Sequence, residues 1–325
     1  MRVFVAGATG AIGLRLLPRL VAAGHTVEGT TRRAEKISFI ESSGARAVIM
    51  DGLDMHSVTR AVAEAAPDVI VHEMTDLAGT SDLRHFDRTF EMSNRLRTEG
   101  TDHLLAAARQ SGVKRFVAQS FCGWPYARNG ALVKVETDPL DPAPPREFRR
   151  TLEAIRYLER VVTEASPLEG VVLRYGVFYG PATGMCDPAA IAQIRRRLMP
   201  LIGDGEGRWS FIHVDDAAAA TAIAIERGSP GVYNIVDDEP APVREWLPVL
   251  AAASGAKPPR HVPAWLGRFL AGEHLVAMMT ENRAGSNAKA KAALGWSPAH
   301  SSWRQGFAEI LTQNKAKQAS EARAA

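Results

Sequence analysis

Cysteine is scarce in this chain of 325 residues, which contains only Cys122 and Cys186. Two distant cysteines provide neither a disulfide framework nor the ligand spacing of a zinc site, so we expect no structural metal. Long apolar runs are absent too, because no stretch reaches the ~20 residues that span a bilayer. The apolar run at the N-terminus stops at Ala6 and meets glycine, unlike a secretory signal. We therefore expect a cytoplasmic protein without membrane partners.

An excess of charge of one sign is also missing. Lys and Arg number 39 against 36 Asp and Glu, which gives a net charge of +3. A dedicated nucleic-acid-binding protein would carry a concentrated basic face. We expect a small-molecule substrate and no nucleic-acid partner, and we leave a homodimer open. The hydrophobic fraction of 46% is typical of a globular protein, and a chain of this length buries a core without disulfides.

Short apolar runs alternate with longer helical patterns in the first half of the chain. The pattern predicts strands at 3–6, 25–30, 47–50, 68–72, 114–119 and 170–175, with helices between them. Strands that are apolar throughout indicate a parallel sheet covered on both faces. The expected fold is therefore α/β, a doubly wound parallel Rossmann sheet with a smaller mixed α/β C-terminal substrate lobe.

The expected domain boundary lies just after the sixth strand. Residues 1–178 form the dinucleotide-binding domain, and residues 179–313 form the substrate-binding lobe, part of which can return to the sheet. Residues 314–325 are polar and rich in alanine, which is typical of a flexible tail.

Gly7, Gly10 and Gly13 form the strongest motif. They follow the first strand and precede the first helix, which is the context that a dinucleotide-binding fingerprint requires. The first glycine permits a tight turn, the second lets a pyrophosphate approach the backbone, and the third lets helix and strand pack closely. Free N–H groups at the helix N-terminus then hold the anion. The alternative is a loop of turn glycines without a ligand.

The end of the second strand bears on the choice of cofactor. Thr31, Arg32 and Arg33 stand there, and Glu28 lies too early in the strand to bind the ribose hydroxyls of NAD. Guanidinium groups pair with phosphate through charge and forked donors. The sequence therefore favours NADP(H) over NAD(H), with solvated arginines at a helix start as the alternative.

With the spacing G-x-x-G-x-x-G, the chain resembles the extended short-chain dehydrogenase/reductase superfamily, of the NAD-dependent epimerase/dehydratase type. Further segments that resemble this family are 51–53, 97–101, 112–117, 173–181, 211–216 and 294–298. The resemblance implies an NAD(P)-dependent enzyme with a Rossmann domain. Together with the motifs above, it places the cofactor contacts at Gly7, Thr9, Gly10, Ala11, Ile12, Gly13, Thr31, Arg32, Arg33, Asp51, Gly52, Leu53, Met74, Thr75, Arg97, Ser120, Tyr175, Gly176 and Val177.

The catalytic signature that this resemblance implies is missing. The family uses a Tyr-x-x-x-Lys pair on the helix after the fifth strand, where the lysine lowers the pKa of the tyrosine. Here Thr151 occupies the tyrosine position and Ile155 the lysine position. The asparagine of the preceding helix is replaced by Arg97, and the catalytic Ser/Thr position falls near Cys122.

A replacement proton donor must therefore lie elsewhere if the chain is an enzyme. Tyr126 is the first candidate, because it follows the fifth strand near the edge where ligands bind. Cys122 is the second. The alternative for each is a packing role in the pocket wall. The expected substrate pocket comprises Trp124, Tyr179, Met185, Trp209 and His213.

These observations predict an NADP(H)-dependent oxidoreductase or epimerase-like enzyme with an atypical active site, acting on a small carbonyl, enone or sugar-like substrate. Two alternatives stay open. One is a non-catalytic NADP(H)-binding sensor or scaffold, which the missing pair permits. The other is a nucleotide-sugar epimerase or dehydratase, which the missing pair weakens.

Overall fold

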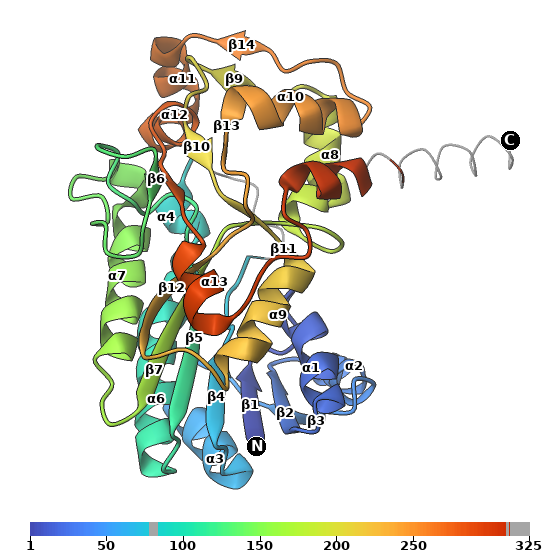
Figure 1. Cartoon of the computed structure of the whole chain (residues 1–325), viewed down its shortest axis with the longest axis vertical. Coiled ribbons are helices and arrows are strands. Elements are labelled where there is room, and N and C mark those ends of the chain that lie inside the picture. The colour runs from blue at the N-terminus through green and yellow to red at the C-terminus, as the bar shows by residue number, and fades with distance from the viewer. Residues whose placement is uncertain (78–83, 310–311, 313–325) are drawn as a thin grey trace, which may run out of the picture.

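A computed structural model describes residues 1–77, 84–309 and 312 of the chain. Its centre is a seven-stranded sheet in the order β12-β7-β5-β4-β1-β2-β3, with all neighbours parallel (Figure 1). The strands are β1 (Arg2–Ala6), β2 (Thr26–Thr31), β3 (Arg46–Ile49), β4 (Val69–His72), β5 (Arg115–Phe121), β7 (Glu169–Tyr175) and β12 (Gly231–Ile235). The predicted doubly wound Rossmann sheet is confirmed.

Helices cover both faces of this sheet. One layer contains α1 (Gly13–Ala22), α2 (Ile37–Glu41), α9 (Val214–Ala224) and α13 (Ala288–Leu294), and the other contains α3 (Met55–Ala65), α6 (Thr101–Gln110) and α7 (Arg149–Thr163). Side chains alternate between the two faces of a strand. In β1, Val3 and Val5 therefore join the first apolar core, whereas Phe4 and Ala6 join the second.

Short helical segments connect these elements near the upper edge of the sheet. They are α4 (Phe86–Thr89), α5 (Glu91–Arg95), a π-helical turn at Leu96–Gly100, and single 3-10 turns at Ala34–Lys36, Arg146–Phe148 and Gly184–Cys186. The π turn runs directly into α6 and packs against α7. Such turns inside helices occur often at functional sites.

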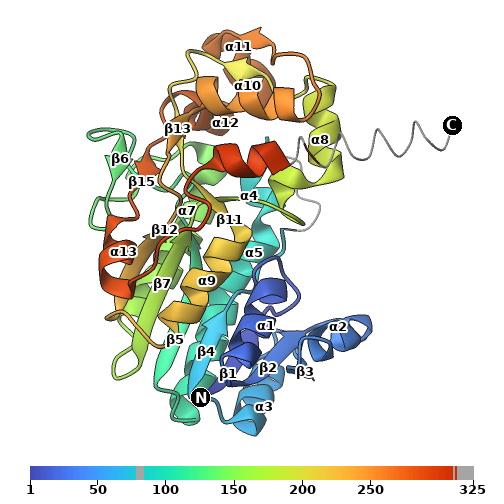
Figure 2. The same ribbon diagram turned by 45° about the vertical axis from the view of Figure 1, so that its right-hand side comes forward.

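A smaller lobe lies above the carboxyl edge of the sheet (Figure 2). Its helices are α8 (Pro188–Arg195), α10 (Val243–Ala253), α11 (Ala264–Ala271) and α12 (Glu273–Thr280). Its two-residue and three-residue strands pair as β8 (Val177–Tyr179) with β11 (Phe211–His213), β9 (Leu201–Ile202) with β14 (His261–Val262), β10 (Arg208–Trp209) with β13 (Ala241–Pro242), and β6 (Val133–Lys134) with β15 (Ala284–Gly285).

Part of the C-terminal half returns to the sheet. Strand β12 pairs with β7, helix α9 packs against α1, and α13 packs against β12, although all three follow residue 179 in the chain. Residues 1–178 and 179–313 are therefore interleaved in space rather than fully separate. The expected tail at 314–325 lies outside the described residues.

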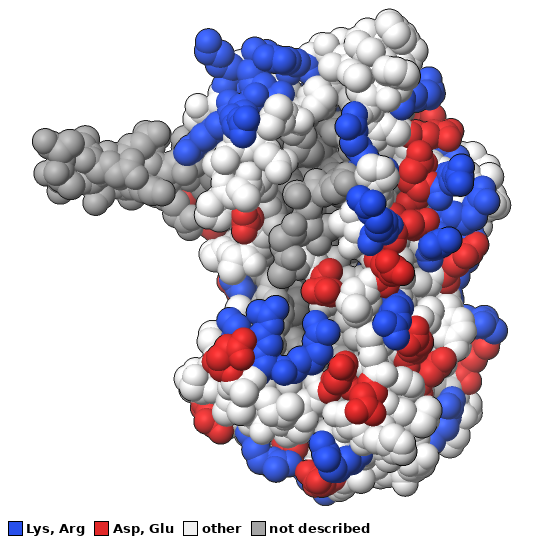
Figure 3. All heavy atoms as spheres, turned by 180° about the vertical axis from the view of Figure 1, so that it is seen from behind, with Lys and Arg blue, Asp and Glu red and all other residues white. Residues whose placement is uncertain are grey.

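Basic and acidic side chains are mixed over much of the molecular face in Figure 3, and basic groups gather on the upper lobe where α8 lies. Arg195 and Arg197 of this region donate to the carbonyls of Ser254 and Pro258. Within the described residues, no helix is both long and apolar enough to cross a membrane.

Arg115, the first residue of β5, links the sheet to helix α9. Its buried guanidinium donates through Nε to the carbonyl of Ala224 at 2.7 Å and through Nη1 to Glu169 at 2.7 Å. Its Nη2 also donates to the carbonyls of Arg227 and Gly228. A cation here stabilises the negative C-terminal end of α9 and joins that helix to β5.

We expect Arg115→Met to lower the free energy of unfolding by about 2–5 kcal/mol, because carbonyls and a carboxylate lose a charged donor. Urea unfolding followed by circular dichroism measures this. Arg109→Met, at an exposed position of α6, should change stability by less than about 0.5 kcal/mol. Equal effects of the two substitutions would show that Arg115 does not join α9 to the sheet.

Candidate active site

The glycine loop between β1 and α1 is shaped by close backbone contacts. Gly7 has φ of 92°, and a Cβ atom there would lie 2.7 Å from the carbonyl carbon of Glu73. A Cβ at Gly13 would overlap the backbone of Ala8. Gly10 differs, because a Cβ there would meet only the carbonyl of Gly7, at 3.4 Å. The protein itself leaves the space in front of Gly10 open, so the loop fits a bound pyrophosphate.

The tip of β2 carries two exposed arginines. Arg32 and Arg33 follow Thr31, whose hydroxyl accepts the backbone N–H of Arg33 at 3.1 Å. Glu28 lies further down the strand and pairs with Arg46 at 2.6 Å. No carboxylate of the described residues pairs with Arg32 or Arg33. The geometry at this tip suits an anion.

The other residues expected to contact the cofactor follow the carboxyl ends of neighbouring strands. Asp51, Gly52 and Leu53 follow β3, and the Asp51 carboxylate accepts the N–H of Leu53 at 3.0 Å. Met74 and Thr75 follow β4, and Ser120 lies at the end of β5. Tyr175, Gly176 and Val177 stand where β7 ends and β8 begins. The sheet thus brings these residues to one edge, where ligands bind in this architecture.

Glu73 is a buried acid at this edge that sequence reasoning missed. Its backbone packs against Gly7, and its Oε1 accepts from the hydroxyl of Tyr175 at 3.0 Å. The Tyr175 hydroxyl also lies 2.6 Å from Thr221 Oγ1. Among the described residues, Glu73 Oε2 has no hydrogen-bond partner. Burial raises the pKa of Glu73 to about 8, although the hydrogen bond from Tyr175 opposes this.

A network of hydrogen bonds surrounds the position on helix α7 where the resemblance implies a tyrosine. Thr151 is buried, donates to Asp87 at 2.8 Å, and accepts from Asn94 Nδ2 at 2.9 Å. Arg97 from the π turn donates to Asn94 Oδ1 at 3.0 Å. Ile155, at the lysine position, packs in an apolar cluster with Phe86 and Phe148. Neither Thr151 nor Ile155 supplies an acid.

The two candidate proton donors, Tyr126 and Cys122, are buried. Tyr126 is 1% exposed; its hydroxyl donates to Asn234 at 2.8 Å and accepts from Arg174 at 2.9 Å. Burial raises the pKa of Tyr126 above its ordinary value. Burial also raises the pKa of the Cys122 thiol to about 12. These surroundings favour packing and hydrogen bonding, and the catalytic assignment of both residues stays a prediction.

A buried ion pair lies between these candidates and α7. Arg174 of β7 binds Glu159 of α7 with two contacts, at 2.6 and 2.5 Å, and Ser120 donates to the same carboxylate at 2.7 Å. Burial alone would lower the pKa of Arg174, but the hydrogen bonds and charge of Glu159 raise it. Sequence reasoning missed this pair, although charged residues inside otherwise apolar segments were its signal.

The residues expected in the substrate pocket fall into two groups. Trp124 and Trp209 lie with ring centroids 5.4 Å apart, and Trp124 also contacts Phe86 and His274. In the part of the chain that the structure describes, neither Trp124 Nε1 nor His274 Nε2 has a hydrogen-bond partner. Burial lowers the pKa of His274 to about 3, so this ring is neutral at pH 7. An aromatic wall thus stands above the end of β5.

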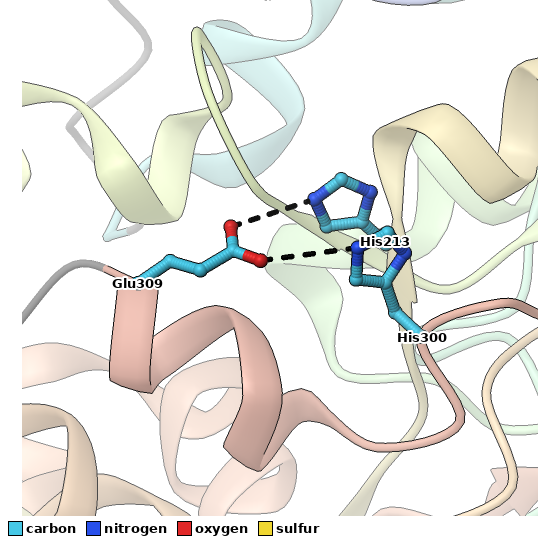
Figure 4. Close-up of side chains that lie close together, drawn as sticks. All are labelled: His213, His300 and Glu309. Atoms are coloured by element: carbon cyan, nitrogen blue, oxygen red, sulfur yellow. Dashed lines mark ion pairs between the residues drawn. The ribbon is translucent and has the colours of Figure 1, made fainter.

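Tyr179 and His213 form the second group, on the side of α9, while Met185 lies half-buried in the turn after β8. The Tyr179 and His213 rings lie 5.3 Å apart. His213 stacks on His300 at 3.7 Å, and both face Glu309, with Nε2 to carboxylate distances of 4.0 and 3.8 Å (Figure 4).

Spacing alone would let His213, His300 and Glu309 bind a metal ion. However, His213 Nδ1 accepts the backbone N–H of Asp215 at 3.2 Å, so its Nε2 carries the proton. Two nearly parallel rings also do not point their lone pairs at one ion. The arrangement therefore does not favour metal coordination, and the distances to Glu309 are those of a loose polar contact rather than of hydrogen bonds.

Glu73 predicts a specific dependence of stability on pH. Between its unfolded pKa of 4.5 and its folded pKa of about 8, the folded state keeps a proton that the unfolded state releases. Burial of the protonated Glu73 therefore stabilises the folded state fully below pH 4.5. This contribution falls by about 1.4 kcal/mol for each pH unit as pH rises from 4.5 to about 8.

Glu73→Gln removes this titration. Urea unfolding across that window should therefore show the stability of the unsubstituted protein falling relative to the variant as pH rises. Glu153→Gln, at an exposed position of α7, provides the control. A difference between Glu73→Gln and the unsubstituted protein that is constant with pH would contradict the buried, protonated state of Glu73.

Comparison with known proteins agrees with this geometry. The model of the NAD dependent epimerase/dehydratase family matches residues 3–236. The chain is 42% identical to a 3-diazoavenalumate denitrifying reductase of Streptomyces over 309 residues, which cover 94% of this chain and 99% of the relative. It is 30% identical to a 4-hydroxy-2-methyl-3-oxo-4-farnesyl-3,4-dihydroquinoline-1-oxide ketoreductase of Stigmatella aurantiaca, over 79% of this chain and 74% of the relative.

Among solved structures, a UDP-glucose 4-epimerase of Thermotoga maritima with UDP-glucose is similar in fold. Its TM-score is 0.77 at 22% identity, with 98% of this chain and 100% of that chain covered. The family match spans most of the sheet and the whole edge described above. The chain belongs to the NAD dependent epimerase/dehydratase family and is an NAD(P)-dependent enzyme of the oxidoreductase/epimerase type.

Proposed function

We propose that the chain is an NADP(H)-dependent reductase that transfers hydride to an aromatic diazo group and releases dinitrogen. The observation that carries this proposal is the loss of the proton-donating pair on α7, where Thr151 and Ile155 are buried in other contacts. The 42% identity to a denitrifying reductase of a diazo compound supports it.

The chemistry of a diazonium group explains why the pair is dispensable. Reduction of a carbonyl places a proton on oxygen, which the family's tyrosine would supply. An aromatic diazonium instead accepts the hydride electron pair in a new C–H bond, while the C–N bond breaks and N₂ leaves with its electrons. No proton from the protein enters this balance. The nicotinamide cofactor, when bound, supplies the hydride.

Residues at the sheet edge would hold the cofactor. The backbone from Gly7 to Gly13 and the N-terminus of α1 suit its pyrophosphate, and Asp51 and Leu53 suit the adenine end. At the tip of β2, Arg32 and Arg33 suit a 2′-phosphate, which supports NADP(H) over NAD(H).

The aromatic wall supports an aryl substrate. Trp124, Trp209 and the neutral ring of His274 pack together beyond the end of β5, and Trp124 is partly exposed there. Aromatic rings bind one another through edge and stacking contacts and exclude water. The partly exposed ring of Trp124 would therefore suit contact with a planar aromatic substrate.

Carbonyl reduction is the second candidate, and the ketoreductase relative at 30% identity favours it. In that reaction the protein must donate a proton, and Tyr126 and then Cys122 are the groups to test. The single substitution Tyr126→Phe therefore separates the two candidates.

Cofactor preference gives one prediction. Arg32→Ala should weaken NADP⁺ binding ~10- to 100-fold, because a charge-assisted contact worth about 1.5–3 kcal/mol is lost, and should leave NAD⁺ affinity nearly unchanged. Isothermal titration calorimetry with both cofactors measures this. Arg19→Ala, at an exposed position of α1, is the control. Equal affinities of the unsubstituted protein for the two cofactors would reject the preference.

Turnover gives another prediction. With NADPH deuterated at one C4 face and 2-diazophenolate, we expect one N₂ per NADPH oxidised and deuterium on the ring carbon that lost nitrogen. The enzyme should transfer deuterium from only one of the two faces of C4. This selectivity distinguishes the enzymatic reaction from background reduction. Tyr126→Phe should keep turnover within about tenfold, whereas a general acid contributes ~100-fold or more. No N₂ above the enzyme-free rate would refute diazo reduction.

A further inference from the structure

Arg97 is a buried cation with most of its donors unused. Its side chain is 6% exposed, and it lies in the π turn between α5 and α6. A guanidinium carries five N–H donors. Within the described part of the chain, only Asn94 accepts one of them, at 3.0 Å, and no carboxylate forms an ion pair with Arg97.

The charges around Arg97 do not balance. The charge of Glu159 raises the pKa of Arg97, but both oxygens of that carboxylate are already bound by Arg174 and Ser120. Burial outweighs Glu159 and lowers the pKa of Arg97 to about 10, so the group stays charged at pH 7. Two arginines therefore share one glutamate.

A buried cation that lacks an ion-pair partner is unfavourable, and an anion that binds beside it relieves that cost. Asp87 does not serve, because its carboxylate accepts from the backbone N–H groups of Arg150 and Thr151 and from the Thr151 hydroxyl. The free donors of Arg97 thus point to an anion that comes with a ligand.

Hydrogen bonds through Asn94 of α5 connect Arg97 to Thr151 of α7. Thr151 occupies the position of the family's proton-donating tyrosine. The family resemblance implies that the group at this position lies near the oxygen of the substrate. Arg97, joined to it through Asn94, would supply a cation for that oxygen in its anionic form.

We propose that Arg97 is the anion-binding residue of the active site and holds a phenolate oxygen of the substrate beside the carbon that loses nitrogen. This inference rests on the proposed function and names its substrate class, an aromatic diazo compound with an ortho phenolate. The Arg97 fork suits such an oxygen better than a lysine would.

Atoms and charges balance when the substrate carries this phenolate oxygen. An ortho-diazophenolate carries one positive and one negative charge. Hydride forms the C–H bond, N₂ departs with the C–N electron pair, and the product keeps the negative oxygen, which takes a proton from water after release. Arg97 compensates that charge throughout. A diazonium cation without the phenolate would instead be repelled by Arg97.

Two properties of Arg97→Met test the proposal. The free protein should unfold at an unchanged or higher temperature, because an unpaired buried cation is replaced by an apolar chain of similar shape. A lower unfolding temperature would show a structural role and overturn the proposal. Arg97→Lys keeps the charge without the fork.

Binding of 4-nitrophenol to the NADP⁺ complex provides the second readout, because its phenolate absorbs visible light. The unsubstituted protein should bind phenolate at least tenfold tighter than phenol, which lowers the pKa of the bound probe by one unit or more. Arg97→Met should lose this preference, Arg97→Lys should keep part of it, and Arg149→Met, at an exposed position of α7, should resemble the unsubstituted protein.

The outcomes separate this inference from the proposed function. Absence of probe binding, or equal preference in the unsubstituted protein and Arg97→Met, would overturn the role of Arg97 whether or not diazo compounds are reduced. A phenolate preference that depends on Arg97, together with no release of N₂ from 2-diazophenolate, would support the anion site and reject the diazo reaction. Reduction of 2-diazophenolate at equal rates by both proteins would overturn the inference and keep the reaction.

Discussion

The buried pair between Glu159 and Arg174 is the contact on which the arrangement of the site depends. It joins helix α7 to strand β7, and its members also bind Ser120 of β5 and Tyr126 of the following loop. Tyr126 in turn reaches Asn234 of β12. Taking two charges out of water is costly, so such a pair requires full hydrogen bonding. The bonds that satisfy it fix the positions of three strands, one helix and one loop relative to one another.

This cluster changes what the family's scaffold can do. The sheet edge retains the features that backbone geometry imposes, namely the open face at Gly10 and the tight contact of Gly7 with Glu73. At the positions where the resemblance implies a tyrosine and a lysine, Thr151 hydrogen-bonds to Asp87 and Asn94, and Ile155 packs in an apolar cluster. The Arg97 guanidinium and the protonated Glu73 lie within the same edge. In the proposed reaction, the site would therefore stabilise a fixed distribution of charge rather than exchange protons with a substrate.

Sequence reasoning was most accurate where one element determines its own structure. The apolar runs at 3–6 and 68–72 could only be buried strands, and the glycine spacing required a turn into a helix. It missed interactions that depend on side chains distant in sequence. Glu159 and Arg174 meet only because α7 packs on β7, and the Glu73 carboxylate meets a Tyr175 hydroxyl that is 102 residues away in the sequence. Tyr126 was selected for its chemistry and its place after a strand, and neither property revealed that Arg174 already binds its hydroxyl.

The return of β12, α9 and α13 to the sheet limits how this protein can be rearranged. These segments belong to the half of the chain that also builds the substrate lobe, yet they form one edge strand and part of one helical layer of the Rossmann sheet. A graft that exchanges residues 179–313 with those of a relative would therefore replace the packing partners of α1 and β7 along with the pocket. Substitutions in the turn 180–187 lie outside the sheet and outside the Glu159–Arg174 cluster, and would leave these packing partners unchanged.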